Sequence, residues 1–210
     1  MRVEAGVVRR EDAHLTRLEG SAAAYGLPFE RERASAAVRA AVAAHGRDAL
    51  LRLRLDLSPD GALRARAESF ADDTRVAPVH VVLADERVDA EDPRQRHKST
   101  DRERYDLAAA WAREVGVADV VFLNGRGTVA EGAISTVFVR RHGRLCTPPI
   151  ADGALPGVLR AELLASGEAV EGSLVVDDLA GELYLGSALR GLRRAVLRAP
   201  AAPRTGSAAR

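Results

Sequence analysis

The hydrophobic pattern is clearest at residues 51–57, where Leu alternates with Arg or Asp at every second position. A period of two places the leucines on one face of a strand and the charged side chains on the other. The turn sequence Ser58-Pro59-Asp60-Gly61 follows, and residues 63–67 alternate again. The pattern therefore predicts a β-hairpin in an antiparallel sheet.

Other stretches place apolar residues three or four positions apart, which is the spacing of an amphipathic helix. Gly or Pro follows most of them, and both residues commonly end helices. The predicted helices are residues 12–25, followed by Gly26 and Pro28; residues 30–44, followed by Gly46; residues 102–115, followed by Gly116; and a helix from Gly157 to about residue 166.

Short apolar runs predict further strands. They are residues 1–8, with a turn at Ala5-Gly6, and residues 79–83, 119–123, 128–131, 135–141, 144–147, 182–185 and 195–197. The order of elements predicts an α+β fold of two lobes. We expect an N-terminal lobe at residues 1–84, a polar linker at 85–97, a second lobe at 98–198 and a disordered tail at 199–210.

The composition predicts a globular, cytoplasmic protein. Of the 210 residues, 47% are hydrophobic and 29% are charged, and the net charge is +1 with Arg and acidic residues interspersed. This balance does not favour nucleic-acid binding, which needs a clustered basic face. The single Cys146 cannot form an internal disulfide, which is typical of a reducing compartment. No apolar run reaches the roughly 18 residues that would span a membrane.

Lys98 is the only lysine in the chain, and Arg takes every other long cationic position. An Arg guanidinium stays protonated, whereas burial can turn a lysine ammonium into a free amine that reacts with carbonyl compounds. The position therefore suggests a chemical need for an amine. A leftover surface lysine explains this fact equally well when it is taken alone.

Two further features accompany Lys98, which lies at the predicted boundary between the lobes. Glu131 ends the otherwise apolar segment Val129-Ala130-Glu131, and the turn Pro156-Gly157 opens a helix whose first backbone N–H groups can bind an anion. An amine, an acid and a phosphate cradle are the parts of a pyridoxal phosphate site. Singly each is weak, because a Glu at a strand end is more often a surface charge.

Other kinds of catalytic site find little support. The five His residues and Cys146 lack the spacing of metal ligands. No nucleophile elbow of the Gly-x-Ser-x-Gly type and no Gly-rich phosphate loop ending in Lys is present. We therefore predict no metal site.

Five blocks in order resemble the signature of the fold-type IV pyridoxal phosphate enzymes, the class IV aminotransferase family. They are His14-Leu15-Thr16-Arg17-Leu18, Lys98, Glu131-Gly132-Ala133-Ile134-Ser135, Thr147-Pro148-Pro149-Ile150 and Leu155-Pro156-Gly157-Val158-Leu159-Arg160. The family includes branched-chain and D-amino-acid aminotransferases and aminodeoxychorismate lyase. The segment His97-Lys98-Ser99-Thr100-Asp101-Arg102, with Tyr105, is most similar to the lyases.

The resemblance implies a pyridoxal phosphate cofactor and a role for each matching residue. Lys98 is the expected Schiff-base lysine and general base, and Glu131 is expected to pair with the pyridine nitrogen. The expected phosphate contacts are Arg17, the backbone amides of Val158 and Leu159, and Ser187, while Tyr105 is expected to hydrogen-bond the phenolic oxygen of the cofactor.

The chain also departs from the family. Family members carry a strand and a Phe-Glu-Thr-like segment before the position of Met1, so we expect a shortened N-terminal lobe. Thr136 stands where Asn is usual, and Ala188 where Ser or Thr is expected. These changes leave the strength of phosphate binding open.

Three functions stay open on the sequence alone. They are a lyase that forms 4-aminobenzoate for folate biosynthesis, an aminotransferase on the same fold, and a degenerate relative without catalysis. The resemblance also implies a homodimer acting on a small molecule, and a possible partner in aminodeoxychorismate synthase.

Overall fold

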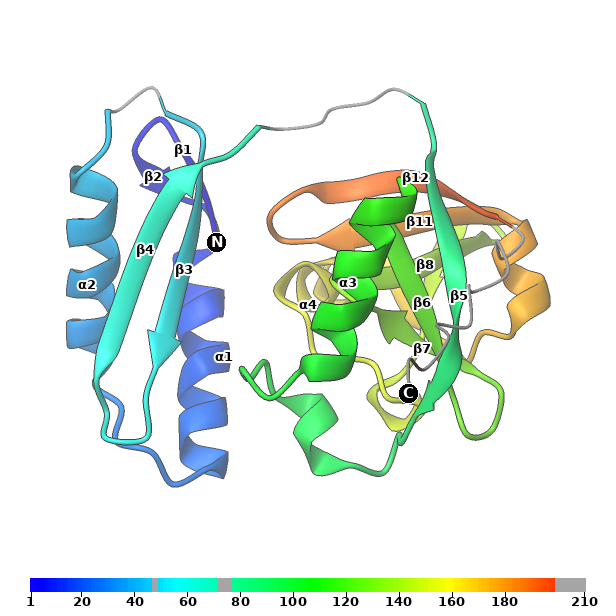
Figure 1. The fold of residues 1–210 in the computed structure, drawn as a ribbon, viewed down its shortest axis with the longest axis horizontal. Helices are drawn as coiled ribbons and strands as arrows, with labels where there is room; N and C mark the ends of the chain where they lie inside the picture. Colours follow the sequence, from blue (N-terminus) through cyan, green and yellow to red (C-terminus); the bar gives the residue numbers. More distant parts are fainter. Residues whose placement is uncertain (47–48, 72–76, 199–210) are drawn as a thin grey trace, which may run out of the picture.

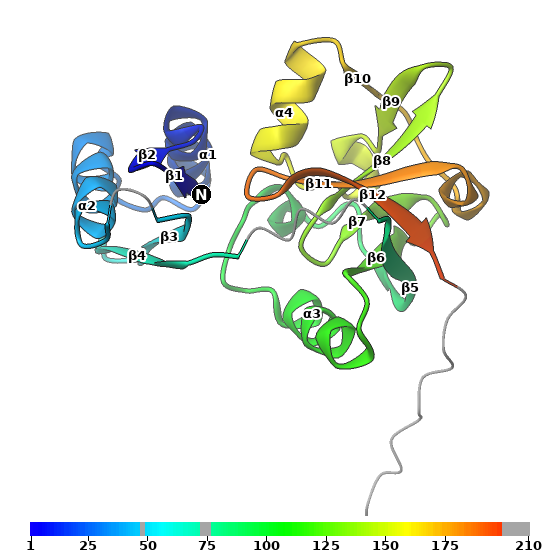
Figure 2. The same cartoon turned by 90° about the horizontal axis from the view of Figure 1, so that it is seen from above.

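The computed structural model describes residues 1–46, 49–71 and 77–198, and they form two lobes that lie side by side (Figure 1). The N-terminal lobe is a four-stranded sheet in the order β2-β1-β3-β4, with all neighbours antiparallel. Two helices lie on one side of it (Figure 2). Its elements are β1 (Arg2–Glu4), β2 (Val7–Val8), α1 (Glu11–Ala24), α2 (Arg31–Ala43), β3 (Leu51–Leu57) and β4 (Leu63–Ser69).

The predicted hairpin is confirmed, with β3 and β4 paired from Leu51 with Ser69 to Leu57 with Leu63. Leu51 and Leu53 are buried in a cluster with Val38 of α2, whereas Arg52 and Arg54, which alternate with them, are exposed. The alternation thus builds the core of this lobe, because each leucine loses its contact with water against the helix.

The second lobe is a curled eight-stranded sheet with helices outside it (Figure 2). The strand order is β10-β9-β8-β11-β12-β5-β6-β7. The strands are β5 (Val79–Val88), β6 (Asp119–Asn124), β7 (Val129–Gly132), β8 (Thr136–Arg141), β9 (Arg144–Thr147), β10 (Ala169–Glu171), β11 (Glu182–Ser187) and β12 (Gly191–Leu197). The helices are α3 (Glu103–Val115) and α4 (Val158–Ala165), with short 3-10 helices η1 (Pro93–Arg96), η2 (Ile150–Asp152) and η3 (Val176–Ala180).

Both faces of this sheet are apolar. On β6, Phe122 packs in a cluster with Ala112 of α3, while its neighbour Val121 points into an inner cluster shared with β5, β8 and β11. On β8, Phe138 packs against Leu159 of α4. Because successive residues of a strand face opposite sides, continuous apolar runs such as β6 indicate burial on both faces.

One predicted strand belongs to the other lobe. Residues 79–83 were expected to complete the first lobe and residues 85–97 to link the lobes, but Val79–Val88 is one strand, β5, paired in parallel with β12 and β6. The polar residues that suggested a linker lie where the pairing with β6 shifts register, between Leu83 and Arg87. A β-bulge, which tolerates exposed polar side chains, was thus mistaken for the start of a linker. The predicted tail at residues 199–210 lies outside the described residues.

Polar contacts join the lobes along α1, which lies nearest the second lobe (Figure 1). Arg10 pairs with Glu162 of α4, with one N–O distance of 3.0 Å, and Ser21 Oγ lies 3.1 Å from His97 Nδ1. In β1, the Arg2 guanidinium donates to the carbonyl of Leu189 at 3.0 Å. Among the helices of the described ranges, none is both long and apolar enough to cross a membrane.

Candidate active site

The segment that carries Lys98 is held from both sides. On its N-terminal side the Asp92 carboxylate accepts a hydrogen bond from the amide of Arg94 at 2.9 Å and caps η1. The next residue after η1, His97, contacts Ser21 and meets the ring of Tyr25 edge-on, with ring centroids 5.1 Å apart. Lys98 therefore lies between helix α1 of the first lobe and the start of α3.

The surroundings of Lys98 favour its neutral amine. Burial lowers its pKa from 10.5 to about 8, and the charges of Arg102, Arg17 and Arg54 add to this effect, opposed only by Glu131. The side chain is nevertheless accessible to solvent. It is thus an amine surrounded by protein and cationic charge yet open to an incoming molecule, as a lysine that reacts with a carbonyl compound requires.

Arg17 lies on α1, one turn beyond His14. Burial lowers the pKa of its guanidinium, and no hydrogen bond or ion pair joins its side chain to the described residues, unlike Arg10 on the same helix. Arg17 is partly buried, and a partly desolvated guanidinium without a carboxylate is stabilised when an anion binds it. Arg17 therefore fits the phosphate role that the sequence suggested.

Glu131 lies on β7, and its Oε2 accepts a hydrogen bond from the amide of Leu155 at 3.2 Å. Burial raises the pKa of the carboxyl to about 7, although Tyr105, the Leu155 amide, Lys98 and Arg102 act to lower it. Near neutral pH the carboxyl therefore exchanges its proton readily, which suits a group that faces a ring nitrogen.

Tyr105 lies on α3 and contacts the same region. Its hydroxyl donates to Gln95 Oε1 at 2.7 Å, and its ring meets Phe122 edge-on at 5.1 Å. Burial, followed by the charge of Glu131, raises the pKa of the phenol. Tyr105 thus stays a neutral hydroxyl. Its one hydrogen is directed to Gln95, so donation to another acceptor requires that the hydroxyl turn away from Gln95.

Gly157 is the N-cap of α4, and no side chain caps this helix. The backbone N–H groups of the first turn, which include Val158 and Leu159, have no partner within the helix and can bind an anion. A Cβ added to Gly157 would lie 3.2 Å from Thr136 Oγ1, so glycine lets β8 approach the helix start closely. The expected phosphate contact Ser187 points into its own turn, where its Oγ accepts from the amide of Arg190 at 3.1 Å.

Sequence reasoning gave no role to three residues near Lys98. Arg102 donates to the carbonyl of Ala133 at 2.7 Å and to Asp106 at 2.8 Å, and this holds its charge close to Lys98. Gln95 orients the hydroxyl of Tyr105, and Arg54 brings charge from the N-terminal lobe. A possible signal was the position of Arg102, four residues after Lys98 in the block that resembles the lyases.

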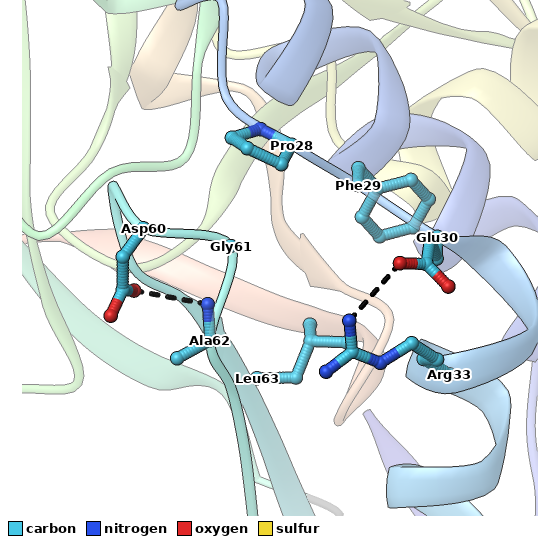
Figure 3. A pocket seen from close by; sticks show the side chains of 8 residues that line it. All are labelled: Pro28, Phe29, Glu30, Arg33, Asp60, Gly61, Ala62 and Leu63. Atoms are coloured by element: carbon cyan, nitrogen blue, oxygen red, sulfur yellow. Dashed lines mark hydrogen bonds and ion pairs between the residues drawn. The ribbon is translucent and has the colours of Figure 1, made fainter.

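A hollow elsewhere on the surface does not compete as the site. It lies in the N-terminal lobe, where the segment after α1 meets the turn between β3 and β4, and is shown in Figure 3. Its polar groups pair with one another, since Arg33 contacts Glu30 at 3.1 Å and Asp60 accepts from the amide of Ala62 at 3.0 Å. The residues that line it are Pro28, Phe29, Glu30, Arg33, Asp60, Gly61, Ala62 and Leu63.

The fold and the site define a pyridoxal phosphate-dependent enzyme of fold type IV, as the resemblance predicted. Residues 1–197 match the model of the amino-transferase class IV family, and the chain belongs to that family. Its α+β fold of two lobes and its cofactor class are thereby confirmed.

Solved structures and a relative similar to this chain carry names of two kinds, aminotransferase and lyase. A protein of Mesorhizobium loti, provisionally named an amino-acid aminotransferase, is 36% identical with a TM-score of 0.88, over 94% of this chain and 97% of that one. A protein provisionally named 4-amino-4-deoxychorismate lyase is 26% identical with a TM-score of 0.82, over 93% of this chain and 81% of that one. A Thermotoga maritima protein named a probable branched-chain-amino-acid aminotransferase is 34% identical over 68 residues, 32% of this chain. That match spans only 25% of the relative.

The residues present fit the cofactor of the family. Arg17 is a partly buried cation without a partner among the described residues, and Gly157 leaves room at a helix start without a side-chain cap. Glu131 and Lys98 supply the acid and the amine, with pKa values near 7 and 8. An aldehyde, a ring nitrogen and a phosphate would each find a group of matching chemistry.

Proposed function

We propose that this chain is a 4-amino-4-deoxychorismate lyase, which releases pyruvate and forms 4-aminobenzoate. The observation that favours this activity is the charge around Lys98, where Arg102, Arg17 and Arg54 act against Glu131 alone. The lyase substrate carries two carboxylates, whereas a branched-chain amino acid carries one and needs an apolar pocket. With Arg17 assigned to phosphate, Arg102 and Arg54 remain near Lys98. Each already pairs with one carboxylate, Asp106 at 2.8 Å and Asp56 at 2.7 Å, so a dicarboxylate would share these guanidinium groups with them.

Pyridoxal phosphate supplies an aldehyde that binds the substrate amine and a ring that accepts the electron pair released next to it. We assign its phosphate to Arg17 and to the amides of Val158 and Leu159. Its ring nitrogen is assigned to Glu131, whose proton is mobile near pH 7, and its phenolic oxygen to Tyr105. Ser187 remains a candidate for a phosphate contact through its hydroxyl hydrogen.

Lys98 would hold the cofactor through its amine, and the same amine, when free, would act as the base. Its free amine takes the proton from the ring carbon that bears the substrate nitrogen. The C–O bond to the enolpyruvyl group breaks, and the ring becomes aromatic. The departing enolpyruvate gains a proton at its methylene carbon and becomes pyruvate, so protons and electrons balance.

A second candidate is an aminotransferase, which the names of the Mesorhizobium loti and Thermotoga maritima relatives favour. Lys98 would then again take the proton from the carbon that bears the substrate nitrogen. The amino group would stay with the cofactor, and water would supply the oxygen of the departing keto acid. A third candidate, a relative without turnover, is less consistent with a lysine whose pKa is lowered to about 8.

Two assays on the cofactor-loaded protein separate these candidates. Aminodeoxychorismate should yield pyruvate and 4-aminobenzoate in equal amounts, and L- or D-amino acids alone should not change the visible spectrum of the enzyme. Conversion of the spectrum by an amino acid without pyruvate release would instead establish the aminotransferase.

Lys98→Ala provides the control for both assays. We expect it to lose activity by about 10⁴-fold or more, because base and carbonyl attachment disappear together. Borohydride treatment followed by mass spectrometry should trap the cofactor on Lys98 in the wild type and nowhere in the variant. Wild-type protein without an adduct at saturating cofactor would contradict both enzymatic functions.

We also propose that the chain forms a homodimer, with aminodeoxychorismate synthase as a candidate partner in supplying substrate. Support comes from Leu107 on α3 and Ile134 in the loop after β7, large apolar side chains that are 64% and 47% exposed. Light scattering during size-exclusion chromatography measures the oligomeric state, and a monomer at micromolar concentration would rule out a stable dimer.

A further inference from the structure

Thr136 is the first residue of β8, and it lies where three segments meet. Its strand pairing places it opposite Gly186 of β11, and its hydroxyl oxygen lies 3.2 Å from the position of a Cβ on Gly157, the N-cap of α4. Side chains of paired residues point to the same face of a sheet. Thr136 is therefore on the face that α4 covers, directly beneath the start of this helix.

The pairing of Phe138 supports this placement. Phe138 lies two residues along β8, and so on the same face, and it clusters with Leu159 of α4. A Cβ on Gly186 would come within 2.5 Å of the Phe138 ring, so β11 offers no side chain at this point of the face. Thr136 therefore has a glycine on each side, Gly186 on β11 and Gly157 at the start of α4, and neither covers it with a side chain.

The hydroxyl of Thr136 has no assigned partner. No hydrogen bond joins its Oγ1 to a residue in the part of the chain that the structure describes, whereas Thr147 Oγ1, on the neighbouring strand β9, donates to the carbonyl of Val137 at 2.8 Å. The residue is only partly buried, so a ligand can reach it. The adjacent α4 start has no side-chain cap. Arg17 lies on the helix whose Arg10 pairs with Glu162 of α4, and within residues 1–46, 49–71 and 77–198 it has no partner either.

From this arrangement we propose that the Thr136 hydroxyl donates a hydrogen bond to the phosphate of the cofactor, beside the first amides of α4. The inference rests on the proposed cofactor site and adds a ligand to it. The sequence comparison with the family, which usually has Asn where this chain has Thr136, left the strength of phosphate binding open. In this proposal the threonine itself contacts the phosphate. Because Oγ1 lies under the helix start, it contributes to affinity for the phosphate group and not for the ring.

The test compares two aldehydes that differ only in the phosphate, pyridoxal phosphate and pyridoxal. Their dissociation constants are measured by visible absorbance with wild type, Thr136→Val, Thr136→Ser and the control Thr16→Val, a matched change on the exposed side of α1. A hydrogen bond to a charged group is worth enough that Thr136→Val should weaken pyridoxal phosphate binding by about 10-fold or more. Pyridoxal binding should change less than about twofold, and Thr136→Ser and Thr16→Val should resemble wild type.

A second measurement uses no aldehyde. Inorganic phosphate should raise the melting temperature of the unloaded wild type and of Thr136→Ser more than that of Thr136→Val. Binding of pyridoxal by a variant shows that its site is folded. A misfolded Thr136→Val would bind neither pyridoxal phosphate nor pyridoxal, and the comparison of wild type with Thr136→Ser would then take its place. Equal affinity losses for the two aldehydes in folded Thr136→Val, or no loss for either, would overturn the role of Thr136 and leave the proposed function intact. Failure of wild type to attach either aldehyde to Lys98 would overturn both.

Discussion

Lys98 and Glu131 have pKa values of about 8 and about 7, although the ordinary values are 10.5 and 4.5. Burial moves both toward neutrality, because each charged form loses contact with water. Two groups that titrate close to the working pH can both exchange protons during a reaction cycle. The unloaded site is therefore already tuned for proton transfer.

The raised pKa of Glu131 predicts a pH-dependent cost to stability. The folded state binds the proton more tightly than the unfolded state, so the stabilising contribution is complete below pH 4.5 and is lost as the pH rises through about 7. In unloaded protein, Glu131→Gln should therefore gain stability over wild type by about 2 kcal/mol between pH 5 and pH 8. Urea unfolding at both pH values measures this gain. The free energy of unfolding of the exposed control Glu114→Gln should change with pH as that of wild type does. The same pH dependence in Glu131→Gln as in wild type would contradict the prediction.

At single positions, sequence reasoning proposed residues whose chemistry is unusual for their place, such as a sole lysine and an acid in an apolar strand. The structure brings Lys98, Arg17, Glu131 and Tyr105 into one region, and their effects on the pKa values of Lys98, Tyr105 and Glu131 indicate this proximity. Gln95 was missed because its function arises only from a contact with Tyr105. Such contacts depend on how helices and strands pack, and the sequence around one residue does not predict this packing.

At the scale of elements, the start of α4 depends on the lack of a side chain at Gly157. The backbone there has φ −70° and ψ 146°, which alanine also adopts, so Gly157→Ala meets only the contact with Thr136. We expect a small loss of stability, below about 1 kcal/mol, because a threonine side chain can rotate away. Affinity for pyridoxal phosphate should nevertheless fall by about 10-fold, since the cradle is displaced.

Thermal unfolding and cofactor titration of Gly157→Ala test this, with Gly125→Ala as the control. Gly125 lies in the turn after β6, and a Cβ there meets nothing within 4 Å. Equal cofactor affinity in both variants would show that the close approach of β8 and α4 is not needed.

The elements themselves were largely predictable where one face is polar. The hairpin β3–β4 follows from its period of two, and α1, α2 and α3 follow from their apolar spacing and terminal glycines. The three-residue strand β10 is too short to carry a period. The far end of β5 was misread because a bulge interrupts its pattern near Arg87.

At the scale of the molecule, the lobes are joined through polar pairs. Arg10 and Glu162 are 31% and 50% exposed, so their interaction is screened by solvent. A double-mutant cycle with Arg10→Gln and Glu162→Gln should give a coupling of about 0.5 kcal/mol that shrinks in high salt. A coupling above about 2 kcal/mol that persists in salt would instead mean that this pair fixes the lobes rigidly.

The strand order of the second lobe could not be predicted from the sequence, because β5 pairs with β12, more than a hundred residues away. No local pattern specifies such a parallel neighbour. The pairing was recovered only from the structure, and it explains why β5 belongs to the second lobe.

The position of β12 also has a consequence for synthesis on the ribosome. This strand joins β11 on one side to β5 on the other. Until residues 191–197 emerge, the strand sets β10-β9-β8-β11 and β5-β6-β7 meet only through their shared apolar cluster and through loop contacts such as that of Gly132 with Ser135. Glu131 on β7 belongs to one set, and Thr136 on β8 belongs to the other. The backbone pairing of the sheet is therefore completed only late in synthesis, when the last strand becomes available.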